Sequence, residues 1–178
     1  ALSYAFDFEW TNKNLFYDAY KRSNSFFENS ELASSGLPTE KELDILNAYI
    51  DQLPKEIFDK DFKLPKTDGS GFIREELRKA TSLLKDSGWD LIDGKLINRN
   101  NGNRFTFEIL LVSPAFERIV LPFKDNLEKL GIDVEVRTID SAQYQKRLES
   151  FDFDMVVQSF SQSLSPGNEQ RSFWGSDA

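Results

Sequence analysis

The sequence predicts an α/β fold whose core is a β-α-β-α-β unit over residues 105–160. Three apolar segments have strand character and two helical segments separate them. The first of these helices begins at Ser113-Pro114, a serine cap followed by proline at the first helical position, and ends at Gly131. Right-handed crossovers make the three strands parallel neighbours in one sheet. The strand segments are 105–112, 132–139 and 151–160, and the helices are 114–130 and 141–151.

The preceding residues add flanking helices and a small hairpin. Apolar residues at helical spacing predict a helix from Leu2 to Phe16, although one helical stripe cannot hide all the aromatic residues of this segment. A capping box of Thr39 and Glu42 predicts a second helix that ends before Pro54. Residues 54–70 have the composition of an irregular surface connection.

Further along, an amphipathic helix is expected from residue 71 to Gly88, and Asp93-Gly94 suits a tight hairpin turn. Pro122 is expected to kink or divide the helix that contains it. The sequence therefore divides into a helical and irregular part, 1–70, and an α/β part, 71–178.

Composition favours binding over chemistry. The chain has 178 residues, a net charge of −8, and neither cysteine nor histidine. Cysteine nucleophiles, disulfides, Cys/His zinc sites and histidine bases are thereby excluded, and catalysis would require carboxylates, Lys, Tyr or a cofactor. The acidic balance argues against nucleic-acid partners, and no apolar run is long enough for direct membrane insertion. We expect no catalytic residue, no metal and no cofactor.

The candidate site is the segment 158–175, "QSFSQSLSPGNEQRSFWG", which follows the third strand. In open α/β sheets, ligands bind beyond the carboxyl ends of the strands. The mixture of hydroxyl, amide, charged and aromatic groups suits a ligand with amide and carboxylate groups. The residues alone also allow a mobile terminal segment. The predicted ligand-binding residues are Gln158, Ser159, Ser161, Gln162, Ser163, Ser165, Asn168, Glu169, Arg171 and Trp174, with Ser113 and Phe26.

Other constellations are weaker. The serines lack a GxSxG elbow, and the pairs Asp152/Asp154 and Glu75/Glu76 are typical of a solvated face. The segments 68–71 and 100–103 match no phosphate loop and are interpreted as turns. Two alternatives to a binding protein remain open: a doubly wound α/β enzyme domain that uses carboxylates or a cofactor, and a non-catalytic interaction domain.

Several motifs resemble those of the family 5 extracellular solute-binding proteins, the peptide receptors of bacterial ABC importers. They are "ALSYAFDFEWTNKNLFY", "SFFENSELASSGLP", "LLKDSGWDLIDGKL", "LLVSPAFERIVLPF" and "QSLSPGNEQRSFWGS". The resemblance extends from end to end and is strongest to Yej-type members, which are associated with oligopeptide and microcin C uptake. It implies a periplasmic receptor, its signal peptide removed, that closes two lobes over a peptide or peptide-like ligand and delivers it to membrane permease subunits.

The resemblance also implies that residues 1–178 are a single lobe, the truncated C-terminal lobe of a type II periplasmic binding protein, with a three-layer-like arrangement. In oligopeptide and dipeptide receptors, an aspartate shortly after the last strand holds the peptide's amino terminus. Ser163 occupies that place here, and Val157 corresponds to an arginine of some relatives. Glu169 and Arg171 are the nearby charged substitutes.

Overall fold

The chain forms two units in the computed structural model, which describes residues 1–161, 163 and 165–176. Residues 1–21 and 65–158 make an α/β unit, and residues 22–64 and 159–178 make a second, helical unit. The sequence had placed residues 1–70 in a helical and irregular part. In the structure, residues 1–21 belong instead to the α/β unit. The assignment of the whole chain to one lobe stays a prediction.

The predicted parallel sheet is confirmed in the α/β unit. Its strands are β3 (Thr106–Leu111), β4 (Asp133–Thr138) and β5 (Met155–Val156), in the order β4-β3-β5. Both neighbours pair with β3 in parallel. The prediction of a strand over 151–160 was wrong in length, because β5 has two residues. Phe151 has a positive φ of 54° and the carboxylates of Asp152 and Asp154 bind other groups, so this segment bends instead of pairing.

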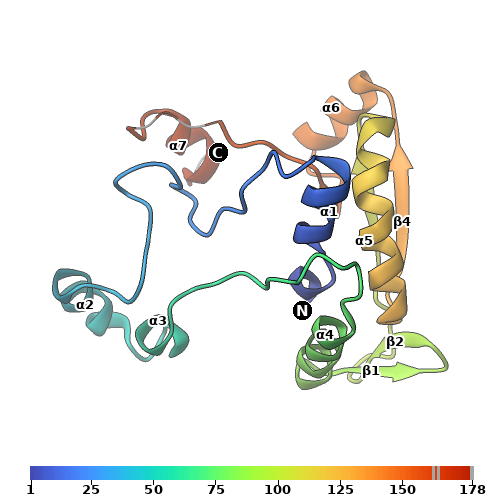
Figure 1. Ribbon diagram of the computed structural model, residues 1–178, viewed down its shortest axis with the longest axis horizontal. Coiled ribbons are helices and arrows are strands. Elements are labelled where there is room, and N and C mark those ends of the chain that lie inside the picture. The colour runs from blue at the N-terminus through green and yellow to red at the C-terminus, as the bar shows by residue number, and fades with distance from the viewer. Residues whose placement is uncertain (162, 164, 177–178) are drawn as a thin grey trace. The chain divides into compact units, whose positions relative to one another are not determined.

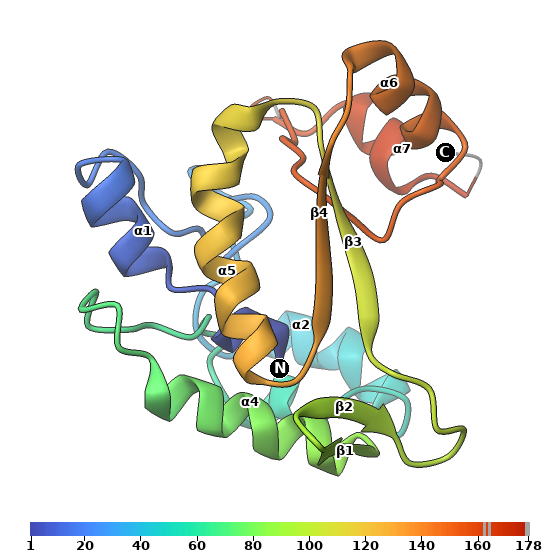
Figure 2. The same cartoon turned by 90° about the vertical axis from the view of Figure 1, so that its right-hand side faces the viewer.

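Each face of the sheet has its own helix. Helix α5 (Glu117–Lys129) lies alongside β4 in Figures 1 and 2 and closes the main core. Because side chains alternate along a strand, Glu108 points to the opposite face from Ile109 and Leu111. Arg147 of α6 (Ser141–Glu149) pairs with Glu108, so α6 lies on that opposite face. The core on the α5 side comprises Ala5, Ala80, Leu84, Leu96, Ile109, Leu111, Val120, Leu127, Leu130, Ile132 and Val134.

The first predicted helix is interrupted. A short 3-10 helix η1 (Leu2–Tyr4) precedes α1 (Phe8–Leu15), and the buried Asp7 separates them. The Asp7 carboxylate accepts the Trp10 amide at 3.1 Å, as a helix N-cap, and the Thr67 hydroxyl at 2.5 Å. Thr67 also donates its amide to Glu9 at 3.1 Å. These bonds tie the segment after residue 65 to α1, 58 to 60 residues earlier in the chain.

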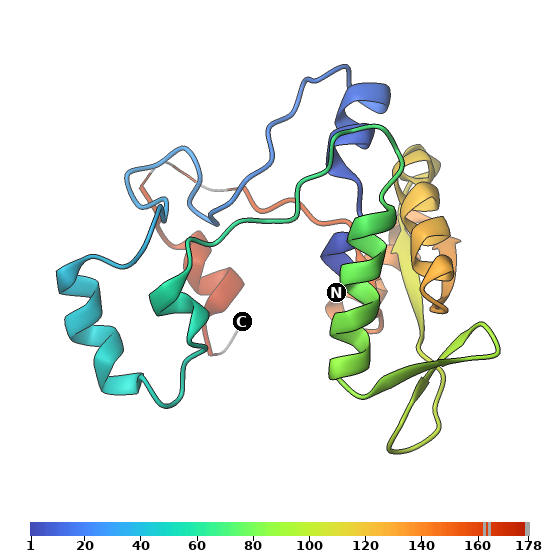
Figure 3. The same cartoon turned by 60° about the horizontal axis from the view of Figure 1, so that its bottom comes forward.

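The hairpin and its neighbouring helix form as predicted. Helix α4 (Arg74–Asp86) leads into β1 (Trp89–Ile92) and β2 (Lys95–Asn98), which are visible beside it in Figure 3. Asp93 and Gly94 both have positive φ, as the two-residue turn requires. The hairpin is tied to the sheet by the Leu96 amide, which donates to the Gly131 carbonyl at 2.8 Å. A Cβ at Gly131 would lie 2.9 Å from that amide nitrogen, so this contact requires glycine.

Pro122 does not divide its helix. Helix α5 is continuous across it, after a 3-10 turn η3 (Pro114–Phe116). Proline deprives the carbonyl four residues earlier of a donor, and here that carbonyl belongs to Arg118 in the first turn. The loss is confined to one bond near the start of the helix, which continues to Lys129. Of the two expected effects, division of the helix was therefore wrong, whereas a kink at Pro122 stays a prediction.

The helical unit consists of short elements. Helix α2 (Glu40–Leu46) has the predicted capping box, in which the Thr39 amide donates to Glu42 at 2.6 Å, and it continues into a 3-10 turn η2 (Asn47–Tyr49). The sequence did not predict α3 (Glu56–Asp59) or α7 (Glu169–Trp174). No described residue of this unit is buried. Among the helices of the described residues, none has the length and apolar character that a membrane span requires.

Candidate ligand-binding site

The carboxyl edge of the parallel sheet carries the two predicted site residues of the α/β unit. Ser113 and Gln158 each follow a strand end by two residues, after β3 and β5 respectively. The Ser113 hydroxyl accepts the Ala115 amide at 3.3 Å and so caps η3. Its own proton stays available for a ligand carbonyl. Gln158 is exposed.

A buried tyrosine lies beneath this edge. Tyr144 of α6 donates its hydroxyl to the Val157 carbonyl at 3.4 Å. Burial raises the pKa of Tyr144, which keeps the phenol neutral and able to donate. The contact links α6 to the residue that precedes Gln158.

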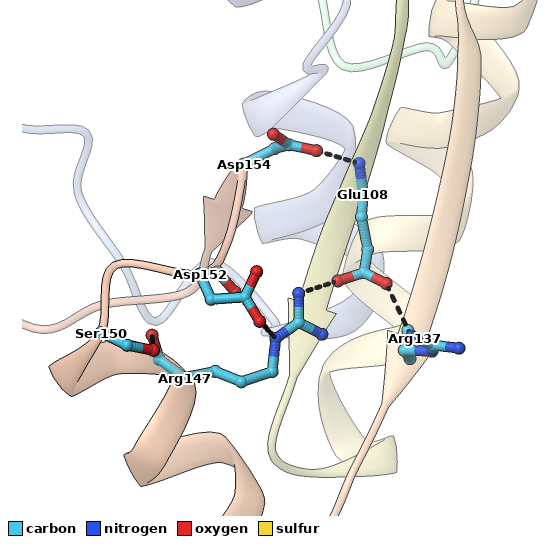
Figure 4. Close-up of polar contacts among 6 residues, drawn as sticks. All are labelled: Glu108, Arg137, Arg147, Ser150, Asp152 and Asp154. Atoms are coloured by element: carbon cyan, nitrogen blue, oxygen red, sulfur yellow. Dashed lines mark hydrogen bonds and ion pairs between the residues drawn. The ribbon is translucent and has the colours of Figure 1, made fainter.

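An ion network fixes the short strand β5 (Figure 4). Glu108 lies between two arginines: its Oε1 is 2.8 Å from Arg147 Nη2 and its Oε2 is 3.5 Å from Arg137 Nη1. Arg147 Nε also pairs with Asp152 Oδ2 at 3.0 Å. The Asp154 carboxylate accepts the Glu108 amide at 2.9 Å. Both aspartates are exposed, as the sequence predicted, and in addition their carboxylates hold the bend before β5.

In the helical unit, the predicted loop is organised around Glu169. Its carboxylate Oε1 accepts the Gly167 amide at 2.9 Å and lies 3.3 Å from the Ser163 hydroxyl, which also donates to the Ser165 carbonyl. The hydrogen bond from Gly167 is the main reason that the pKa of Glu169 is lowered. Glu169 therefore closes a loop at the start of α7, and Ser163 is part of that closure.

An aromatic cluster packs on the same helical unit. It consists of Phe26, Phe160, Phe173 and Trp174. Trp174 meets Phe26 edge-on at 5.2 Å and stacks on Phe160 at 6.0 Å, and Phe160 meets Phe173 at 5.3 Å. Trp174 is 62% exposed and Phe160 48%. The candidate segment 158–175 contained Phe160 and Phe173, but of this cluster only Phe26 and Trp174 were among the predicted ligand-binding residues. Their spacing has no regular period, so only the contacts bring them together.

The remaining predicted residues of the helical unit are exposed. They are Ser159, Ser161, Ser165, Asn168 and Arg171, whose positions on the surface leave them accessible to a ligand. Gln162 lies outside the described residues. Likewise, the described residues contain no group of three carboxylates that could hold a metal ion.

Comparison with known proteins identifies the family. The family model of the bacterial extracellular solute-binding proteins, family 5, matches residues 1–178. The chain belongs to this family. It is 48% identical over its whole length to the uncharacterized protein y4wM of Sinorhizobium fredii and 44% identical to the probable peptide-binding protein YejA of Agrobacterium fabrum. It spans only 27% and 29%, respectively, of these relatives.

Solved structures agree on the fold. The oligopeptide-binding protein AppA of Bacillus subtilis, in complex with a nonapeptide, superposes with a TM-score of 0.63 over 94% of this chain and 28% of its own length. At 18% identity this similarity concerns the fold alone. The chain has the α/β fold of type II periplasmic binding proteins, as the sequence predicted.

Proposed function

We propose that the protein is the substrate-binding component of a bacterial ABC importer and that it binds peptides or peptide-like compounds without catalysis. The observation that carries the proposal is the exposed surface of the helical unit, where a polar loop held by Glu169 lies in the same unit as a half-exposed aromatic cluster. The relative named as a probable peptide-binding protein supports this class of ligand.

The chemistry of that surface suits a peptide. Each amide of a bound peptide needs a hydrogen-bond partner once water is removed. The exposed hydroxyl, amide and guanidinium groups of the loop can supply such partners, and the aromatic rings can cover apolar side chains. We include Ser113 and Gln158 of the α/β unit as further ligand contacts. The ligand-contacting residues of the helical unit are proposed to be Phe26, Ser159, Ser161, Gln162, Ser163, Ser165, Asn168, Glu169, Arg171 and Trp174.

The working cycle in this proposal is binding rather than reaction. Two lobes close over the ligand in the periplasm, and the loaded protein delivers it to the permease subunits. The absence of cysteine and histidine is consistent with this role. Ser163 takes part in loop closure through Glu169, so we propose that it shapes the loop instead of pairing with a peptide's amino terminus as a carboxylate would.

Peptide retention tests the proposal. The protein in its natural length is mixed with a tryptic digest of casein, separated by gel filtration, and the retained peptides are identified by mass spectrometry. We expect retained peptides, and about ten-fold or greater weakening when Ser163, Asn168 and Arg171 are all replaced by alanine, because several ligand hydrogen bonds are lost. If no peptide is retained, the proposed function is wrong. If the triple variant retains peptides as well as the wild type does, only the site assignment is wrong.

A further inference from the structure

Arg118 lies at the carboxyl edge of the sheet, in the first turn of α5. The neighbouring Glu117 accepts the hydroxyl of Thr138, the last residue of β4, at 2.7 Å. The Ile139 amide donates to the carbonyl of Leu111, the last residue of β3, at 3.0 Å. The first turn of α5 is therefore held at the end of β4, which is bonded to the end of β3, at the edge where open α/β sheets take their ligands.

The guanidinium of Arg118 lies over an aromatic ring. Its Cζ atom is 5.7 Å from the ring centroid of Phe16, and the ring of Tyr20 meets Phe16 edge-on at 4.8 Å. A guanidinium within about 6 Å of a ring centroid gains a cation–π attraction. Arg118 is exposed, so its N–H donors can reach a carboxylate while the group stays near the ring.

The ring beneath Arg118 is held rigidly. Asn12, only 8% exposed, donates its side-chain amide to the Tyr20 carbonyl at 2.7 Å and accepts the Tyr20 backbone amide at 3.0 Å. The Asn12 carbonyl also accepts the amides of Phe16 and Asp18, each at 3.1 Å. These bonds hold Tyr17 and Asp18 at positive φ, a conformation that non-glycine residues adopt only when their surroundings impose it. As a result, Tyr17 is 88% exposed.

Arg118 differs from the arginines of the α/β unit that form ion pairs, and from Arg74 and Arg104, which like it have no ion pair among the described residues, in lying over an aromatic ring. Arg99 pairs with Asp90, Arg78 pairs with Glu75, and Arg147 pairs with Glu108. In contrast, no ion pair joins Arg118 to a carboxylate of the described residues, although the chain carries a net charge of −8. An exposed, preoriented guanidinium with open donors is suited to two parallel hydrogen bonds with a planar carboxylate.

We propose that Arg118, held over Phe16, binds a carboxylate group of the peptide or peptide-like ligand. The inference rests on the proposed function and adds a residue and a ligand group to it. Neither the motifs nor the composition single out this residue, because its setting is formed by two segments about 100 residues apart in the chain.

The test compares two probes on the protein in its natural length. One is the tryptic digest of casein, and the other is the same digest after its carboxyl groups have been converted to methylamides. We expect the wild type to retain the free-acid peptides preferentially. Arg118→Gln should weaken their retention by about ten- to a hundred-fold, the range for hydrogen bonds to a charged group, and remove the preference. Phe16→Leu should weaken retention by about two- to five-fold, because the guanidinium loses its platform.

Arg74→Gln is the matched control, since Arg74 is also exposed and lies in the first turn of a 13-residue helix, α4. It should leave the preference intact. Thermal melts establish which variants keep the wild-type transition, and Arg118→Lys serves as a second variant that keeps the charge but loses the paired donors.

If the wild type retains both digests equally, or if a folded Arg118 variant keeps the full preference, the inference is wrong while the proposed function stands. If the wild type retains neither digest, both are wrong.

Discussion

The two units of this protein are stabilised in different ways. The α/β unit contains all the buried apolar side chains of the described residues, from Ala5 to Tyr144. The helical unit contains none, and its described contacts are aromatic edges, short helices and side-chain bonds within loops. Burial of apolar surface is the main favourable term in folding. The difference indicates a rigid scaffold and a helical surface that adapts more easily.

The largest expected effect is the loss of stability when a buried side chain of the α/β unit is shortened. Leu127 of α5 is fully buried, so Leu127→Ala should lower the free energy of unfolding by about 2–5 kcal/mol. Ile45→Ala in the helical unit, where the side chain is 67% exposed, should change it by less than about 0.5 kcal/mol. Urea unfolding followed by circular dichroism measures both. If the two substitutions lowered the free energy of unfolding equally, the proposed difference in how the units are stabilised would be wrong.

The ion network of Figure 4 should have the next largest effect. Glu108→Gln removes the negative charge shared by Arg147 and Arg137. Glu108 and Arg147 are largely buried, so loss of this charge-assisted bond should cost about 1–3 kcal/mol, although Arg147 keeps its pair with Asp152. Hydrogen exchange at Met155 and Val156 should rise. The control is Glu75→Gln, because its pair with Arg78 is exposed and should contribute less than about 1 kcal/mol. Unchanged exchange in β5 would show that the network does not fix this strand.

A smaller and local effect is expected in the aromatic cluster. Phe160→Ala removes contacts with Phe26, Phe173 and Trp174, each worth about 0.5–1.5 kcal/mol beyond the area buried. Hydrogen exchange should accelerate in α7 and not in β3 or β4. Phe62→Ala is a control in the same unit, where the ring is 67% exposed. Acceleration in both units would contradict their separate stabilisation.

The smallest effect is the pH response of the loop. The pKa of Glu169 is lowered chiefly by the Gly167 amide, so the ionised carboxylate stabilises the folded loop. This stabilisation is fully present above the ordinary carboxyl pKa and is lost as the pH falls through the lower folded-state pKa. Exchange of the Gly167 amide, corrected for its intrinsic pH dependence, should increase on acidification. Glu169→Gln should abolish that increase. If the increase remained in this variant, another titrating group would be its cause.

Much of the scaffold could be predicted because its signals are local. Serine and proline at 113–114, the Thr39–Glu42 capping box and the Asp93-Gly94 turn each act within a few residues. The length of β5 could not be predicted, since it depends on bonds from Asp152 and Asp154 to residues of α6 and β3. That Pro122 leaves its helix undivided could not be predicted either, since the effect of a proline depends on how far from the helix start it lies in the folded chain.

By itself, the sequence determined the α/β class, the parallel direction of the three strands and the exclusion of cysteine and histidine chemistry, because periodicity, caps and composition are properties of short segments or of the whole chain. The strand order β4-β3-β5 was decided by the tertiary structure. Family membership was also evident from its motifs and is confirmed by the family model. Only the tertiary structure decided which polar groups are already committed to partners and which are open. Ser163 and Glu169 bind each other within one loop. Arg118, in contrast, lies over Phe16 and is exposed. These contacts depend on distances between residues far apart in the chain, which local patterns do not encode.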